Sequence, residues 1–118
     1  MRDFKELKVW RKAHQFTLDV YRHTKSFPPD ERFGLTAQLR KAASSVPSNI
    51  AEGCGRSGDR ELARFLGIAA GSASESEYQL LLAKDLAYLV PHIHHQLDEQ
   101  VNEIKRMLNA FIKTLTPG

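Results

Sequence analysis

The sequence is poor in the residues that build covalent and metal-based sites. Its 118 residues include one cysteine, Cys54, which excludes an internal disulfide and zinc sites made of cysteines. No stretch approaches the roughly 20 apolar residues of a membrane-spanning helix, and the first residues have no apolar segment typical of a signal peptide. These absences predict one soluble, cytoplasmic domain over residues 1–118, with Cys54 buried as a small apolar side chain.

The sequence also lacks strand-like alternation, low-complexity runs and internal repeats. What it has is an ordinary globular composition, with 42% hydrophobic and 26% charged residues. A chain of this length buries roughly two-thirds of its unfolded surface on folding. We therefore expect it to fold by itself.

Apolar residues recur at three- and four-residue steps in four segments, which is the pattern of helices with one buried face. This spacing predicts helices over residues 4–26, 31–54 and 59–89, and a fourth from Pro91 that ends at Thr116-Pro117-Gly118. Short connections between helices favour antiparallel neighbours. We predict an all-α, antiparallel up-down-up-down four-helix bundle.

A proline interrupts the second predicted helix. Pro47 removes the amide that would bond the carbonyl of Ala43, so we predict a single kinked helix. Ser44 or Ser45 is expected to hydrogen-bond the loosened backbone.

The third predicted helix is apolar around most of its circumference in places. A helix of this kind is either central in the fold or in contact with another subunit. Its middle carries small residues over 69–74, among which Gly71 costs about 1 kcal/mol of helix propensity. Tight packing against a second backbone is the expected compensation.

Two polar lines indicate a candidate site between the second and third helices. Their members share helix faces at three- and four-residue spacing: Ser45, Asn49 and Glu52 on one helix, and Ser72 and Glu75 on the other. We interpret them as a structural network or a subunit contact. The alternative is an enzyme that uses Glu52 and Glu75, although no histidine lies nearby in sequence.

A histidine-rich segment offers a weaker alternative. His92, His95 and Glu99 are spaced to place three metal ligands on one helix face. Histidines after a helix-starting proline are more often solvated, and the chain has no Glu-x-x-His pair typical of di-iron bundles. We predict no metal, cofactor or catalytic residue.

Positive charge is concentrated in the first half of the chain. Residues 1–64 contain thirteen lysines and arginines against eight acidic residues, whereas residues 65–118 contain four against six. The candidate nucleic-acid contacts are Lys5, Lys8, Lys12, Arg40, Lys41, Arg56, Arg60 and Arg64. No base-reading motif accompanies them, so any contact would be with the backbone of RNA or DNA. Ordinary solvated helix faces remain the alternative.

Several segments resemble a known bacterial family. They are Trp10, Phe27-Pro28, Phe33-Gly34-Leu35, Phe65-Leu66 through Gly71-Ser72 and, most specifically, Ser45-Val46-Pro47-Ser48-Asn49-Ile50-Ala51-Glu52-Gly53. Together they look like the 23S rRNA intervening sequence proteins, and the resemblance covers nearly the whole chain. One departure is the run Ala73-Ser74-Glu75-Ser76-Glu77, where the family usually has apolar residues on both sides of the glutamate.

The resemblance implies a four-helix bundle that assembles as a homopentameric ring without known enzymatic activity. It also implies a likeness to the accessory proteins of diversity-generating retroelements, which are basic pentamers that bind a reverse transcriptase and nucleic acid. We therefore expect a homo-oligomeric scaffold whose basic half faces RNA, DNA or a nucleic-acid enzyme. The alternative is a protein-interaction module that binds no nucleic acid.

Overall fold

The computed structural model describes residues 2–116, which form helices and turns without a strand. The four α-helices are α1 (Lys8–Thr24), α2 (Leu35–Cys54), α3 (Asp59–Asp85) and α4 (Pro91–Leu115), and two short 3-10 helices, η1 (Phe4–Glu6) and η2 (Pro29–Glu31), precede α1 and α2. The predicted all-α class is confirmed. The last two residues of the predicted stop after α4, Pro117 and Gly118, lie outside the described residues.

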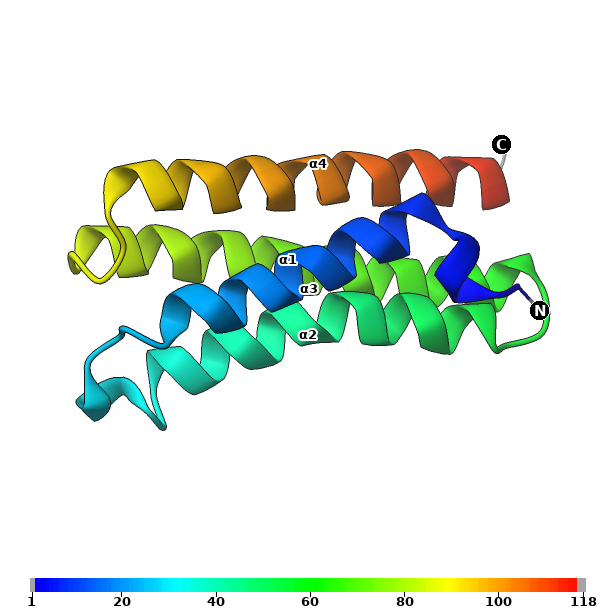
Figure 1. Cartoon of the computed structure of the whole chain (residues 1–118). Helices are drawn as coiled ribbons and strands as arrows, with labels where there is room; N and C mark the ends of the chain where they lie inside the picture. The colour runs from blue at the N-terminus through cyan, green and yellow to red at the C-terminus, as the bar shows by residue number, and fades with distance from the viewer. Residues whose placement is uncertain (1, 117–118) are drawn as a thin grey trace.

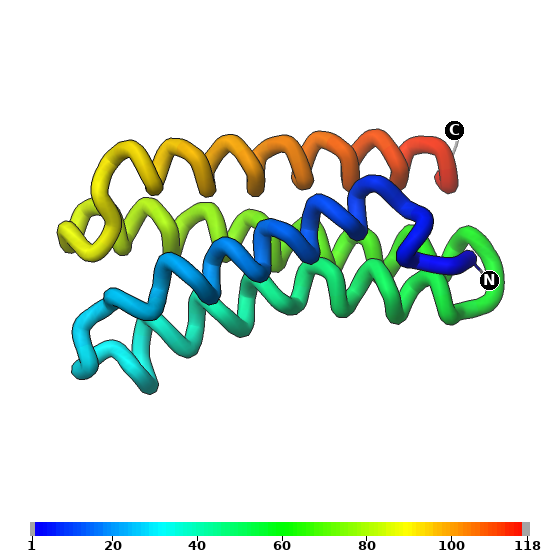
Figure 2. Tube along the Cα trace, viewed as in Figure 1, coloured from blue at the N-terminus to red at the C-terminus, as the bar shows by residue number. Residues whose placement is uncertain are grey.

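Consecutive helices run in opposite directions along a bundle of 44 × 22 × 21 Å (Figure 1). Each helix packs against the next one in the chain, most extensively α2 against α3, and α4 closes the bundle against α1. The tube in Figure 2 shows the start of the chain, the α2–α3 connection and the end of α4 at one end of the bundle. The predicted antiparallel up-down-up-down arrangement is confirmed.

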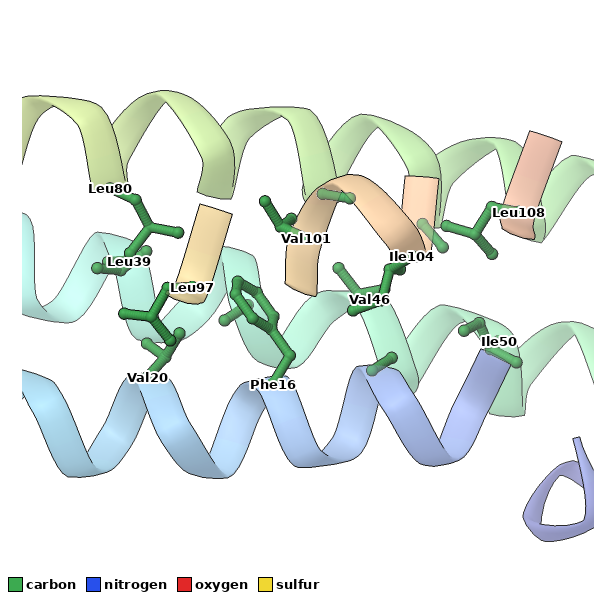
Figure 3. Packing of buried hydrophobic residues seen from close by; sticks show 14 of the residues in the cluster. Phe16, Val20, Leu39, Val46, Ile50, Leu80, Leu97, Val101, Ile104 and Leu108 are labelled. Carbon is green, nitrogen blue, oxygen red and sulfur yellow. The ribbon is translucent and has the colours of Figure 1, made fainter. Parts of the chain in front are cut away.

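The core lies where the apolar stripes of the four helices meet (Figure 3). Its largest wholly buried side chains include Phe16, Leu39, Ile50, Leu66, Leu80, Leu97, Ile104 and Leu108. Burying each side chain of this size contributes about 1.5–3 kcal/mol. Cys54 is also buried, as expected, and its burial raises the pKa of the thiol. Within residues 2–116, no helix has an apolar stretch long enough to cross a membrane.

The first helix begins later than predicted. Leu7 has extended backbone angles, φ −81° and ψ 127°, and separates η1 from α1, so the predicted start at residue 4 is wrong. The preceding residues still belong to the fold, because the Arg2 amide donates to the carbonyl of Cys54 at 3.1 Å. This bond ties the start of the chain to the end of α2.

The second helix begins at Leu35 and not at Glu31 as predicted. Glu31 ends η2, and its Oε1 accepts a hydrogen bond from the Leu35 amide at 3.1 Å. This bond satisfies one of the amides that a helix start leaves without a partner. Glu31 therefore caps α2 from outside the helix.

Pro47 lies within α2, which continues from Leu35 to Cys54 as the single helix predicted. The carbonyl of Ala43, which Pro47 deprives of its usual amide, lies 3.2 Å from Thr17 Oγ1 of α1, whose single hydroxyl hydrogen it shares with the carbonyl of Ala13 at 2.8 Å. Neither Ser44 nor Ser45 fills this role, because each hydroxyl has another partner. The compensation comes from a neighbouring helix, so the local prediction was wrong. The kink itself remains a prediction.

The third helix ends at Asp85, four residues before the predicted end at Leu89. Ala87 has φ +64°, in the left-handed region that an L-residue enters at a cost of roughly 1–2 kcal/mol. The Tyr88 amide then donates to the carbonyl of Ala83 at 2.8 Å and closes the helix end. A glycine would signal such an end in the sequence, and none is present here.

Candidate interaction surfaces

Three of the five residues predicted to form a polar network lie together between α2 and α3. The hydroxyls of Ser45 and Ser72 are 2.9 Å apart, and Asn49 Nδ2 donates to both the hydroxyl and the carbonyl of Ser45. Ser76, which is wholly buried, donates to the carbonyl of Ser72. No charged group takes part in these bonds, and among them the Ser45–Ser72 bond alone joins the two helices, so the network supplies no acid or base.

The two glutamates of the predicted network lie elsewhere. Glu52 is exposed and pairs with Arg56, in the turn after α2, at 3.5 Å, and Glu75 is exposed on α3. With Ser45 opposite Ser72 on antiparallel helices, positions 52 and 75 are separated by about 15 Å along the bundle. Carboxylates that act together on one bond lie within about 10 Å of each other. This geometry argues against the enzyme that would use Glu52 and Glu75.

Of the histidine segment at the start of α4, His92 and His95 are exposed and His94 is half-buried. His95 pairs with Glu99, whereas His92 lies near Gln96 and does not join them as a third metal ligand. Among residues 2–116, no three histidine, cysteine, aspartate or glutamate side chains are grouped closely enough to hold a metal ion. The geometry gives the metal alternative no support.

The eight predicted nucleic-acid contacts do not form one continuous surface. Those at the start of the chain and around the α2–α3 connection, which are Lys5, Lys8, Arg56, Arg60 and Arg64, lie toward one end of the bundle. Lys12 lies farther along α1 and pairs with Glu103 at 3.0 Å. Arg40 and Lys41 lie in the first half of α2, toward the opposite end.

Two of the arginines at the α2–α3 connection already have partners within the chain. Arg64 Nε donates to Glu61 Oε2 at 2.9 Å, which lowers the pKa of the carboxyl group and raises that of the guanidinium. Arg56 pairs with Glu52, and both guanidinium groups lie over the ring of Phe65, at 5.1 and 4.4 Å. Acidic groups therefore offset two of the five candidate cations at this end, whereas Lys5, Lys8 and Arg60 form no ion pair within residues 2–116.

The surroundings of Arg40 are different. Its Nε donates to the hydroxyl of Thr24 at 2.8 Å, and its guanidinium carbon lies 4.7 Å from the centre of the Tyr21 ring. Neither Arg40 nor Lys41 forms an ion pair with a carboxylate of residues 2–116. Their charges are available to an external anion.

Two aromatic residues that the sequence reasoning missed lie beside these charges. Tyr21 and Phe33 line a groove of about 560 Å³ together with Arg32, Arg40 and Lys41. The side chain of Phe33 is 86% exposed, the highest value among the large hydrophobic residues of the described chain. A signal was available, because Phe33 lies outside both helical apolar stripes. We call this surface the aromatic groove.

The solvent-facing side of α3 is a helix face that the bundle leaves uncovered and that contains several exposed apolar residues. Its exposed residues between positions 65 and 84 are Gly67, Ile68, Gly71, Ser74, Glu75, Tyr78 and Leu81, and only one of these is charged. We call this surface the outer face of α3. A Cβ atom built on Gly67 or Gly71 would meet nothing within 4 Å, so no contact within the chain requires a glycine at either position.

Comparisons with known proteins agree with this fold. A crystal structure of a protein with unknown function from the S23 ribosomal protein family of Bacteroides thetaiotaomicron superposes with a TM-score of 0.82, at 23% identity over 89% of this chain and 95% of that chain. At this identity the likeness shows the fold alone. No curated protein matches the chain.

The family described as 23S rRNA-intervening sequence protein matches residues 5–110. This match confirms the resemblance seen in the segment from Ser45 to Gly53. Because it spans most of the sequence, the chain belongs to the 23S rRNA-intervening sequence protein family.

Proposed function

We propose that the chain is a non-enzymatic scaffold subunit that assembles with copies of itself through the outer face of α3 and binds nucleic acid through its basic residues. The family resemblance implies a ring of five copies. The supporting observation is the outer face of α3, which leaves Ile68, Tyr78 and Leu81 each more than 40% exposed. Exposed apolar patches of this kind are typical of protein contact sites.

The glycines of this face strengthen the proposal. Gly67 and Gly71 each cost about 1 kcal/mol relative to alanine in a helix, and the folded chain provides no steric reason for them. A second helix could approach such a smooth surface closely. Another copy of the chain is the partner that we propose, because it is present whenever the protein is made.

The nucleic-acid part of the proposal rests on how charge is distributed. Acidic side chains gather where α4 meets α1, around Asp19, Asp98, Glu99 and Glu103. The unpaired cations of α2 and of the preceding turn lie on a different surface. An anionic polymer would be attracted to one side of the subunit and repelled by the other.

Light scattering with and without a short labelled single-stranded RNA, repeated with single-stranded DNA, tests both parts. We expect a mass of several protomers, near five, and binding that weakens with salt. If the assembly contacts five phosphates, affinity should fall about 100-fold between about 50 and 200 mM salt. A protomer mass at all concentrations would refute the assembly. An oligomer that ignores RNA and DNA would leave the protein-interaction module as the function.

A further inference from the structure

Phe33 is an apolar ring held in solvent by an ordered turn. The Arg32 amide donates to the carbonyl of Pro29 at 3.1 Å, and the Gly34 amide donates to that of Glu31 at 2.9 Å. The backbone on both sides of Phe33 is therefore fixed, while its side chain is 86% exposed and contributes little to the core. The exposed ring is therefore available to a partner outside the chain.

Tyr21 provides a second aromatic surface across the aromatic groove. It lies on α1 with 42% of its area exposed. Arg40 is held beside it, because its Nη2 donates to the Tyr21 carbonyl at 3.4 Å and its Nε donates to Thr24, which is buried. These bonds keep a guanidinium group in place next to the ring.

The groove is cationic. Arg32 lies with its guanidinium carbon 5.2 Å from the centre of the Phe33 ring, and Lys41 is exposed on α2. The carboxylate of Glu31 points away from an ion pair with them: one oxygen accepts from the Leu35 amide at 3.1 Å and the other from the Tyr88 hydroxyl at 2.9 Å. Within residues 2–116, no carboxylate forms an ion pair with Arg32, Arg40 or Lys41.

We propose that the aromatic groove binds single-stranded nucleic acid, with bases stacked on Phe33 and Tyr21 and phosphates held by Arg32, Arg40 and Lys41. The proposal rests on the nucleic-acid part of the proposed function and names its site and ligand class. Aromatic faces combined with unpaired cations are the common means of binding single strands without sequence preference. A duplex fits less well, because its bases are already stacked and cannot reach the rings. An apolar protein surface also fits less well, because it would bury three cations without partners.

The test measures fluorescence anisotropy of labelled oligouridine RNA and oligothymidine DNA of about 12 nucleotides, with a duplex of the same length as competitor. Phe33→Ala should weaken binding of the single strands by roughly 5- to 100-fold, and Phe33→Trp should restore it. Lys41→Gln should reduce the salt slope by about 0.7, because one phosphate fewer is neutralised. Comparing RNA with DNA shows which of the two is preferred. The matched control is Arg60→Gln, at the opposite end of the bundle, which should change affinity much less.

Four outcomes would overturn the proposal. If Phe33→Ala binds like the original protein while Arg60→Gln binds weakly, the site lies at the other end and the proposed function survives. If the original protein binds no oligonucleotide, the nucleic-acid part of the proposed function fails as well. Preference for the duplex would refute stacking. Loss of oligomer mass in Phe33→Ala, measured by light scattering, would assign Phe33 to the subunit contact.

Discussion

Replacing Gly71 with alanine should have opposite effects on the protomer and on the assembly. Within one chain the new Cβ would meet nothing within 4 Å, so the substitution should add about 1 kcal/mol of helix propensity without a clash. For a domain of this size, such a gain raises the melting temperature by about 4 °C. At a close subunit contact the same methyl group would push the neighbouring helix away. Gly71→Ala should therefore give a more stable protomer and a weaker oligomer.

Sedimentation velocity over a dilution series, paired with thermal unfolding of the dissociated protein, separates the two effects. Gly67→Ala should behave in the same way, since its Cβ also has open space. Gly53→Ala is the contrasting control, because its Cβ would lie 2.9 Å from the Cβ of Phe65 and should destabilise the protomer itself. An unchanged oligomer in both outer-face variants would refute a close contact at these glycines. A less stable Gly71→Ala protomer would refute the helix argument.

Two further predictions concern the bundle itself. Lys105 donates to Glu77 at 2.7 Å and lowers the pKa of that carboxyl group, so this pair stabilises the fold above pH 4.5 and the stabilisation is lost as acid protonates Glu77. Thermal unfolding of Glu77→Gln should therefore show a smaller loss of stability between about pH 7 and pH 3 than the original protein. Thr17→Val should cost about 1–2 kcal/mol in urea unfolding, because it removes the hydroxyl that the carbonyls of Ala43 and Ala13 share and leaves the Ala43 carbonyl with no donor. Adding Pro47→Ala restores an amide near that carbonyl and should reduce the cost; equal costs in both backgrounds would contradict this account.

Helices were predictable where a single feature of the sequence was enough to identify them. The single stripes of α1 and α4 and the proline that opens α4 identified those helices, and a run of nine residues identified the family. The boundaries that were missed depend on contacts from other parts of the chain or on an unusual backbone angle. Glu31 caps α2 from the preceding turn, and Ala87 enters the left-handed region without being glycine.

The polar network was predicted only in part, for a similar reason. Helical spacing correctly put Ser45 and Asn49 on one face and Ser72 on the facing helix. Spacing could not predict how far α2 and α3 are shifted along their axes relative to each other, and this shift places Glu52 and Glu75 far apart. Spacing along one helix therefore predicts shared faces, whereas meeting across two helices depends on where the connecting turn begins and ends.

The basic residues show why the number of charges is a weaker guide than their pairing. Arg64 and Arg40 are equivalent in a count of net charge, yet Arg64 is bound to Glu61 and Arg40 forms no ion pair within residues 2–116. An ion pair must be broken or shared before its cation can neutralise a phosphate, whereas an unpaired cation releases its counterions directly. The residues that bind an anionic polymer should therefore be those that the fold leaves unpaired. By this criterion, Arg40 and Lys41 in the first half of α2 are better candidates than Arg56 and Arg64 at the α2–α3 connection.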